Sequence, residues 1–283
     1  MKITDAQVHI WGPDTADRPW PKRTAAQRPV PLATDELLRE MDAAGVERAI
    51  LVPPSWEGDR NDLAIEGFLQ HPERFRIMGR FDTDAPGARK ALETWTDQPG
   101  MLGVRFIFSN PLLQEPLLAG RMDWFWGDAE RMGVPVMALF PFHLMHCADR
   151  IAERHPGLKL VLDHMGLTGD GKDTHAFEGF EKLLLLARHP NVAVKASALP
   201  VFTSDPYPYR NTHKYIERTC EAFGPRRMFW GSDLSRLPCT YRQCITLFTE
   251  ELEWLSKEDL QWIMGRGLNE YLGWHEPSTG HSP

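Results

Sequence analysis

The sequence predicts an α/β protein of the (β/α)8 barrel type, with one barrel over residues 1–274. The length of 283 residues fits one such barrel, which typically takes about 250 residues. Eight short apolar runs alternate with segments of helical pattern along the chain. These runs lack a polar and apolar alternation, as is usual for parallel strands buried on both faces. A doubly wound open sheet is the alternative fold, but no G-x-G-x-x-G motif follows an early strand.

Composition limits the classes of function. The formal net charge of -7, with 42% apolar and 25% charged residues, is typical of a globular protein and argues against a nucleic-acid or anionic-membrane partner. No apolar run approaches the roughly 18 residues of a membrane span, and no signal-peptide core follows Met1. The four cysteines have no C-x-x-C spacing, so we expect reduced thiols. We therefore expect a cytoplasmic protein that binds a small molecule, with its oligomeric state open.

The expected elements follow one another regularly. Helix 34–44 begins with Thr34 as its N-cap and ends at Gly45. Between the first strand and this helix, residues 11–31 carry five prolines and no helical period, which predicts a long covering loop or lid. We expect a flexible tail over residues 275–283. The expected strands are 2–9, 46–52, 75–81, 103–108, 134–140, 158–164, 192–197 and 228–233, and the later helices are 59–70, 85–96, 121–132, 146–154, 176–188, 212–223, 241–252 and 256–264.

Reactive side chains stand at the carboxyl ends of several expected strands. Gln7 and His9 end the first strand, His164 the sixth and Asp233 the eighth. In a parallel barrel these ends form a single mouth, where the first and last strands are neighbours. Two histidines and a carboxylate could bind a metal or carry out acid and base catalysis. A single isolated histidine is better interpreted as a hydrogen-bonded residue of the barrel. Several reactive residues that each end a strand favour a functional site instead.

The motifs at these strand ends resemble those of the amidohydrolase superfamily. They are Asp5-Ala6-Gln7-Val8-His9, Val161-Leu162-Asp163-His164-Met165-Gly166, Asn191-Val192-Ala193-Val194-Lys195 and Gly231-Ser232-Asp233. The similarity is to the branch with 2-pyrone-4,6-dicarboxylate lactonase, sugar-acid lactonases and, more distantly, aromatic-acid decarboxylases. It implies an amidohydrolase-like barrel and hydrolysis of a lactone, or a related ester or amide carbonyl, in a small carboxylated substrate.

The resemblance departs from the metal-dependent members of the superfamily at the first motif. These members usually have an H-x-H motif, whereas this chain has Gln7 in place of the first histidine and His9 as the second. They also have a histidine after the fifth strand, and the only counterpart in this chain, His143, is out of register. A metal would then be held by His9, Asp233 and either His164 or His143, a poor set for zinc. The lactonase relatives resemble metal-independent enzymes, so we favour no metal or other cofactor, although a divalent ion such as zinc is compatible with an amide ligand.

The resemblance also suggests roles in catalysis. Asp233 would take a proton from water as general base, while His164, His9 and the Gln7 amide would polarise the carbonyl and stabilise the oxyanion. Arg105 would bind a substrate carboxylate through its bidentate guanidinium, with a salt bridge inside the barrel as an equal alternative. The expected substrate contacts are Arg105, Lys195, His143, Trp11, Trp56 and Ser109.

Two other functions stay open. One is a metal-dependent aromatic-acid decarboxylase on the same fold, with Asp233 as proton carrier. The other is a non-catalytic binding barrel, because the first histidine of the H-x-H motif is missing. From the sequence, Lys195 could pair with Asp163 or Asp233 as readily as it could bind a substrate. The fold alone does not identify the substrate.

Overall fold

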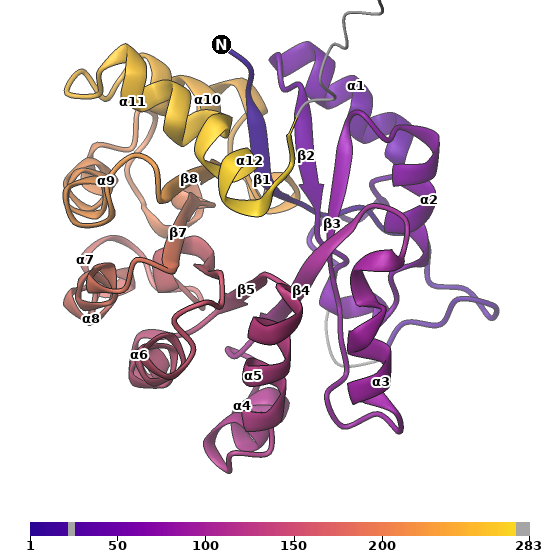
Figure 1. Cartoon of the computed structure of the whole chain (residues 1–283). Coiled ribbons are helices and arrows are strands. Elements are labelled where there is room, and N and C mark those ends of the chain that lie inside the picture. The colour runs from indigo at the N-terminus through magenta and orange to yellow at the C-terminus, as the bar shows by residue number, and fades with distance from the viewer. Residues whose placement is uncertain (22–25, 276–283) are drawn as a thin grey trace, which may run out of the picture.

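A computed structural model describes residues 1–21 and 26–275, and its strands form the predicted parallel barrel. Each strand is hydrogen-bonded in parallel to the next one along the chain. Figure 1 shows the strands at the centre with the helices around them. The strands are β1 (Thr4–Val8), β2 (Arg48–Leu51), β3 (Phe75–Gly79), β4 (Met101–Ile107), β5 (Val136–Leu139), β6 (Leu160–Leu162), β7 (Val192–Ser197) and β8 (Met228–Gly231).

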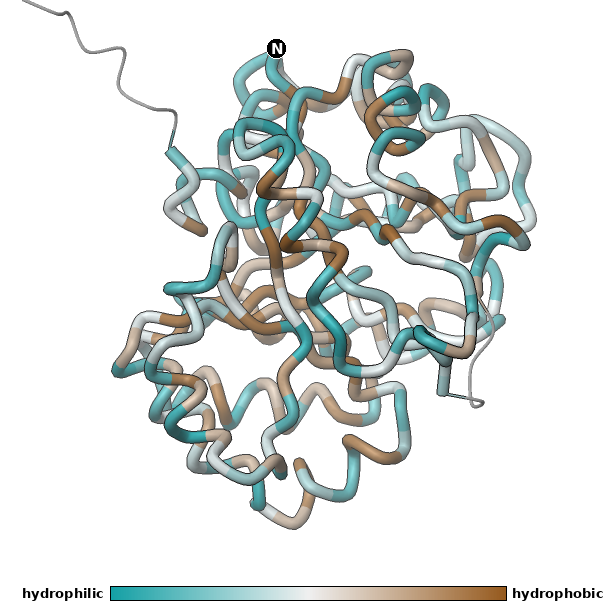
Figure 2. The backbone as a smooth tube through the Cα atoms, turned by 90° about the vertical axis from the view of Figure 1, so that its right-hand side faces the viewer, coloured by the Kyte–Doolittle hydropathy of each residue, from teal (hydrophilic) through white to brown (hydrophobic). Residues whose placement is uncertain are grey.

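The helices cover the outside of the barrel. Polar and apolar residues alternate along the turns of these helices (Figure 2). This pattern is expected for a helix that packs one face against a core. They are α1 (Thr34–Ala44), α2 (Asp62–Gln70), α3 (Ala88–Glu93), α4 (Pro111–Leu118), α5 (Asp123–Met132), α6 (Met145–Arg154), α7 (Asp173–Ala176), α8 (Glu181–Leu184), α9 (Arg210–Phe223), α10 (Tyr241–Thr249), α11 (Lys257–Gln261) and α12 (Gly267–Leu272). None of the helices in the described ranges is long and apolar enough to cross a membrane.

Several expected elements differ from the structure. The expected helix 176–188 is broken into short pieces, and the expected helix 256–264 is the shorter α11 followed by a π-helical turn. Thr34 is the first residue of α1 rather than its N-cap, which is Ala33 without a side-chain cap. The expected tail falls on residues 276–283, outside the described residues, apart from His275.

The barrel interior is filled by one inward residue from nearly every strand. This apolar layer contains Ala6, Ile50, Met78, Met137, Val161, Ala193 and Phe229. Leu268 and Leu272 of α12 belong to the same cluster, and Figure 1 shows α12 crossing one end of the barrel. The interior is therefore a packed core that is closed at the amino end of the strands.

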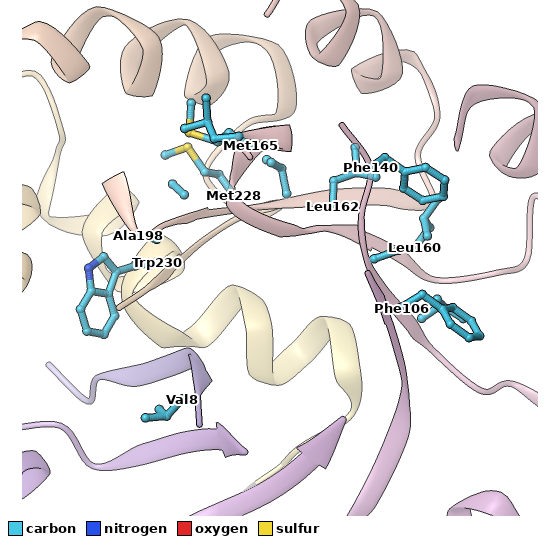
Figure 3. Packing of buried hydrophobic residues seen from close by; sticks show 14 of the residues in the cluster. Val8, Phe106, Phe140, Leu160, Leu162, Met165, Ala198, Met228 and Trp230 are labelled. Carbon is cyan, nitrogen blue, oxygen red and sulfur yellow. The ribbon is translucent and has the colours of Figure 1, made fainter. Parts of the chain in front are cut away.

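The alternate residues of the strands face outward and pack against the helices. Phe106 on β4, Leu160 and Leu162 on β6, and Trp230 on β8 belong to this second, larger cluster, part of which is shown in Figure 3. The alternation explains the unbroken apolar runs in the sequence, because both faces of each strand are buried. It also fixes which residue of a strand end points into the barrel mouth.

The first and last strands meet, as the sequence predicts. The Asp233 backbone N–H donates to the Gln7 carbonyl at 3.1 Å. The buried Asp5 carboxylate accepts from the backbone N–H groups of Gln7 and Ser232, both at 2.9 Å, and from the Tyr241 hydroxyl at 2.7 Å. The pairing register of β1 shifts between Asp5 and Val8. An irregularity of this kind bends the strand locally.

Candidate active site

The catalytic candidates Gln7, His9, His164 and Asp233 form a buried, connected cluster at the carboxyl ends of the strands. The side chain of Asp233 is 1% exposed and that of His9 5%. His164 and Asp233 have left-handed backbone, with φ of 51° and 52°. Non-glycine residues rarely take this conformation, which concentrates at functional sites. The sharp turns after β6 and β8 thereby aim both side chains into one place.

Asp233 lies against His9. His9 Nε2 is 3.0 Å from Asp233 Oδ1, and His9 Nδ1 is 2.6 Å from the Val52 carbonyl oxygen. Both neighbours are acceptors, since a carbonyl only accepts and an ionised carboxylate does the same. Burial alone would raise the pKa of Asp233, but the adjacent His9, together with the charges of His164 and Arg236, outweighs it and holds that pKa well below its usual range.

The Asp233 carboxylate keeps one oxygen without a well-directed hydrogen bond. Among the described residues, Oδ1 lies close enough to His9 for an ion pair but has no partner with hydrogen-bond geometry. Oδ2 lies 3.8 Å from His164 Nε2 and 3.7 Å from Arg236 Nη1. An ionised carboxylate with an open lone pair is able to accept a proton from water.

His164 is oriented by contacts at both ring nitrogens. Nδ1 lies 2.8 Å from Ser197 Oγ, and Nε2 lies 3.2 Å from Gln7 Nε2. The amide nitrogen of Gln7 only donates, so His164 Nε2 accepts and the proton lies on Nδ1. Burial lowers the pKa of His164 to about 4, in agreement with a neutral ring. The orientation of Gln7 is set in turn by Lys195, whose ammonium donates to Gln7 Oε1 at 2.9 Å.

A second buried group of charges lies beside this cluster. Asp163 Oδ1 is 2.8 Å from the Lys195 ammonium, and Asp163 Oδ2 accepts from Arg105 Nε at 3.0 Å. Burial alone would raise the pKa of Asp163, but the two cations outweigh it and the pKa is lowered. Lys195 therefore pairs with Asp163, which was one of the partners open on sequence grounds. Arg105 forms the barrel salt bridge that was the alternative to its substrate-binding role, while both of its Nη groups lack a hydrogen bond among the described residues.

Aromatic residues cover His9. The Trp56 ring packs edge-on against His9 with a centroid distance of 5.8 Å, and Trp11 packs on Trp56 at 5.2 Å. The described parts of the 11–31 loop are fastened on two sides. Arg18 binds Glu57 at 2.7 Å, and Arg28 donates to the Leu234 carbonyl at 3.3 Å. These contacts place the described parts of the loop beside the segments that follow β2 and β8.

Two expected substrate contacts lie elsewhere. Ser109 is exposed just past β4. His143 is exposed and lines a separate surface pocket of about 200 Å³ with His146 and Lys182. Both residues lie beyond the end of a strand, in turns whose course the strand pattern does not determine.

Two residues near the catalytic cluster were given no individual role from the sequence, although Ser197 was expected at a strand end facing the mouth. Ser197 ends β7 and binds His164. Arg236 lies three residues after Asp233 and packs over the Phe202 ring at 5.4 Å. Alternate residues of β7 point into the barrel, and this pattern indicated that Ser197 faces the mouth. The position of Arg236 depends on the turn after β8, which the strand pattern does not predict.

The described residues fit a divalent metal poorly. They contain no group of three or more His, Cys, Asp or Glu side chains arranged to bind a metal ion. The Gln7 oxygen, the hard ligand that replaces a histidine, accepts from Lys195. The His164 lone pair faces the Gln7 amide. The Lys195 ammonium thus occupies the oxygen that would otherwise bind a metal, and its positive charge repels a metal cation.

Two curated proteins are similar to this chain over most of its length. The L-fucono-1,5-lactonase of Burkholderia ambifaria is 26% identical over 251 residues, covering 82% of this chain and 81% of the relative. The 4-sulfomuconolactone hydrolase of Hydrogenophaga intermedia is 24% identical over 241 residues, covering 81% and 73%.

The similarity extends to solved structures. An amidohydrolase of Burkholderia multivorans with bound zinc has a TM-score of 0.79 and 20% identity, with 96% of this chain and 99% of that chain covered. A sequence model of the amidohydrolase family matches residues 4–266. This match spans most of the chain, from β1 to the turn before α12. The chain belongs to the amidohydrolase family.

Proposed function

We propose that this protein hydrolyses the lactone ring of a small carboxylated substrate, with Asp233 as general base. The observation that carries the proposal is the buried Asp233 carboxylate, whose Oδ1 lies 3.0 Å from His9 without a hydrogen-bond partner among the described residues and whose Oδ2 lies 3.8 Å from His164. Two relatives named as a lactonase and a lactone hydrolase support the reaction class. A purified-enzyme screen of carboxylated and neutral lactones, followed by proton release, tests it directly.

The reaction balances without a cofactor. Asp233 takes a proton from water, and the resulting hydroxide attacks the lactone carbonyl carbon. The oxyanion that forms accepts hydrogen bonds from His9 Nε2 and from the second amide hydrogen of Gln7, which act as an oxyanion hole. The ring C–O bond then breaks, and the proton on Asp233 passes to the leaving ring oxygen. The product is an open-chain hydroxy acid.

In this proposal His164 has a different part from the one the sequence suggests. A neutral His164 with its proton on Nδ1 has no hydrogen at Nε2 to give to an oxyanion. Its lone pair at Nε2 instead accepts from Gln7 at 3.2 Å. His164 thereby holds the Gln7 amide in place and leaves the other amide hydrogen for the substrate.

The protonation states predict the acid side of the pH profile. His164 has a pKa of about 4 in the folded protein, below the value of about 6.5 for an ordinary histidine. Protonation of Nε2 would break its contact with the Gln7 amide. We therefore expect kcat/KM to stay level as the pH falls from about 7 to 5 and to decline near pH 4. A decline centred near pH 6.5 would contradict a neutral, buried His164.

Chelation tests the proposed independence from metal. Because the donor groups of Gln7 and His164 are engaged with protein partners, we expect the protein to keep its lactone hydrolysis after dialysis against EDTA. Metal analysis of the same sample should find less than one zinc per chain. Full loss of turnover on chelation, with recovery on added zinc, would instead favour a metal-dependent reaction and reopen the decarboxylase alternative.

A further inference from the structure

Arg80 is a buried cation at the barrel mouth that the proposed mechanism does not use. It follows the last residue of β3, and its side chain is 10% exposed. Its Nη1 is buried and has no hydrogen-bond partner in the described part of the chain. Nε contacts Asp59 at 3.2 Å, but Asp59 is 58% exposed, so this ion pair is weakened by solvent. A buried donor without a partner costs free energy and needs a functional explanation.

The alternation along β3 sets the direction of Arg80. Met78 belongs to the inner apolar layer, and Phe81 packs outward against Trp95 at 5.1 Å and Phe125 at 5.5 Å. Successive residues of an extended segment point to opposite sides. Arg80 therefore points toward the barrel axis, above the inner layer.

The strand register places Arg80 beside Arg105. Gly79 pairs with Val104 across β3 and β4, and Arg80 and Arg105 are the next residue on each strand. Arg105 points inward as well, because Val104 and Phe106 belong to the outer cluster. Burial lowers the pKa of Arg80, and the charge of Arg105 lowers it further, as expected for two guanidinium groups close together.

The charges on this side of the mouth do not balance. Arg105 and Lys195 share one buried carboxylate, Asp163, and Arg80 has only the exposed Asp59 as a counterion. The open donors are Arg80 Nη1 and the Nη groups of Arg105. Guanidinium forks match the two oxygens of a carboxylate, and an anion here would satisfy the donors and the excess charge together.

We propose that Arg80 and Arg105 together bind a carboxylate attached to the lactone ring, and that Arg80 determines the preference for carboxylated over neutral lactones. This inference rests on the proposed lactone hydrolysis and adds the residue that selects the substrate. Arg80 contacts the substrate away from the reacting carbonyl, so it acts mainly on binding, whereas Asp233 acts on turnover.

The test compares γ-butyrolactone with its γ-carboxylate, two substrates with the same ring and one with the added charge. Arg80→Met should lower kcat/KM for the carboxylate about 10- to 100-fold, mostly through KM, since a hydrogen bond to a charged group contributes about 1.5–3 kcal/mol. The value of kcat/KM for the neutral lactone should fall much less. Arg80→Lys keeps the charge without the fork and should recover part of the preference. Arg89→Met, at a side chain that is 67% exposed on α3, is the matched control.

A binding measurement separates this inference from the proposed function. Calorimetric titration with glutarate should give a Kd at least tenfold higher for Arg80→Met and Arg80→Lys than for the wild type and Arg89→Met. If the wild type hydrolyses no lactone of the screen, the proposed function fails, and glutarate still tests the carboxylate site. An equal loss for both lactones, or an unchanged Kd for glutarate in the folded variants, would overturn the role of Arg80. Thermal unfolding followed by circular dichroism identifies the folded variants.

Discussion

Asp233→Asn should reduce kcat for lactone hydrolysis by roughly a hundredfold or more while substrate still binds. The replacement keeps the size of the side chain but removes the negative charge and the proton acceptor. His9 Nε2, 3.0 Å from Asp233 Oδ1, would lose its ionic partner. The measurement is steady-state kinetics across the pH range, with KM and kcat reported separately.

The control for this variant is Asp42→Asn. Asp42 is a carboxylate of the same type that is 65% exposed and pairs with Arg74 on the outside of the barrel. It should leave both kinetic constants unchanged. If Asp233→Asn instead turns over at the wild-type rate at every pH, Asp233 is a structural residue and the hydrolytic mechanism is wrong. A folded Asp233→Asn variant that no longer binds substrate would assign the carboxylate to binding.

Asp163→Asn should cost about 3–5 kcal/mol in the free energy of unfolding, because it leaves two buried cations without a counterion. Asp163 is fully buried and holds Lys195 at 2.8 Å and Arg105 at 3.0 Å. Urea denaturation at pH 7 measures the loss. Glu181→Gln, which breaks a surface pair with Arg218 at 2.7 Å, should cost less than about 1 kcal/mol.

The same carboxylate predicts a dependence of stability on pH. The pKa of Asp163 is lower in the folded protein than in the unfolded chain, so its contribution is fully present above the unfolded value of about 3.9. The contribution is lost as the pH falls through the folded pKa. The wild type should therefore lose more stability than Asp163→Asn on acidification below about pH 4. Parallel stability curves for the two proteins would show that the Asp163 charge does not stabilise the fold.

The order and type of the strands were determined by local patterns in the sequence. Apolar runs bounded by Gly and Pro locate all the strands of the barrel because backbone pairing and two-sided burial act on each strand alike. Helices were harder to predict where tertiary contacts overrule the pattern. Helix α4 was missed, since Pro116 lies inside it and proline usually ends a helix. Helix α12 was also missed. Its apolar residues close the barrel interior, which is a tertiary contact that the local sequence pattern does not indicate.

The sequence by itself determined the barrel and the strand ends that bear Gln7, His9, His164 and Asp233, because strand order brings the carboxyl ends of parallel strands together. Only the tertiary structure decided the contacts within the mouth. The direction of a side chain past a strand end depends on turns such as the left-handed backbone at His164 and Asp233. The proton position on His164 and the pairing of Lys195 with Asp163 depend on neighbours far away in the sequence. Burial and partner geometry fix these properties, and local sequence does not encode them.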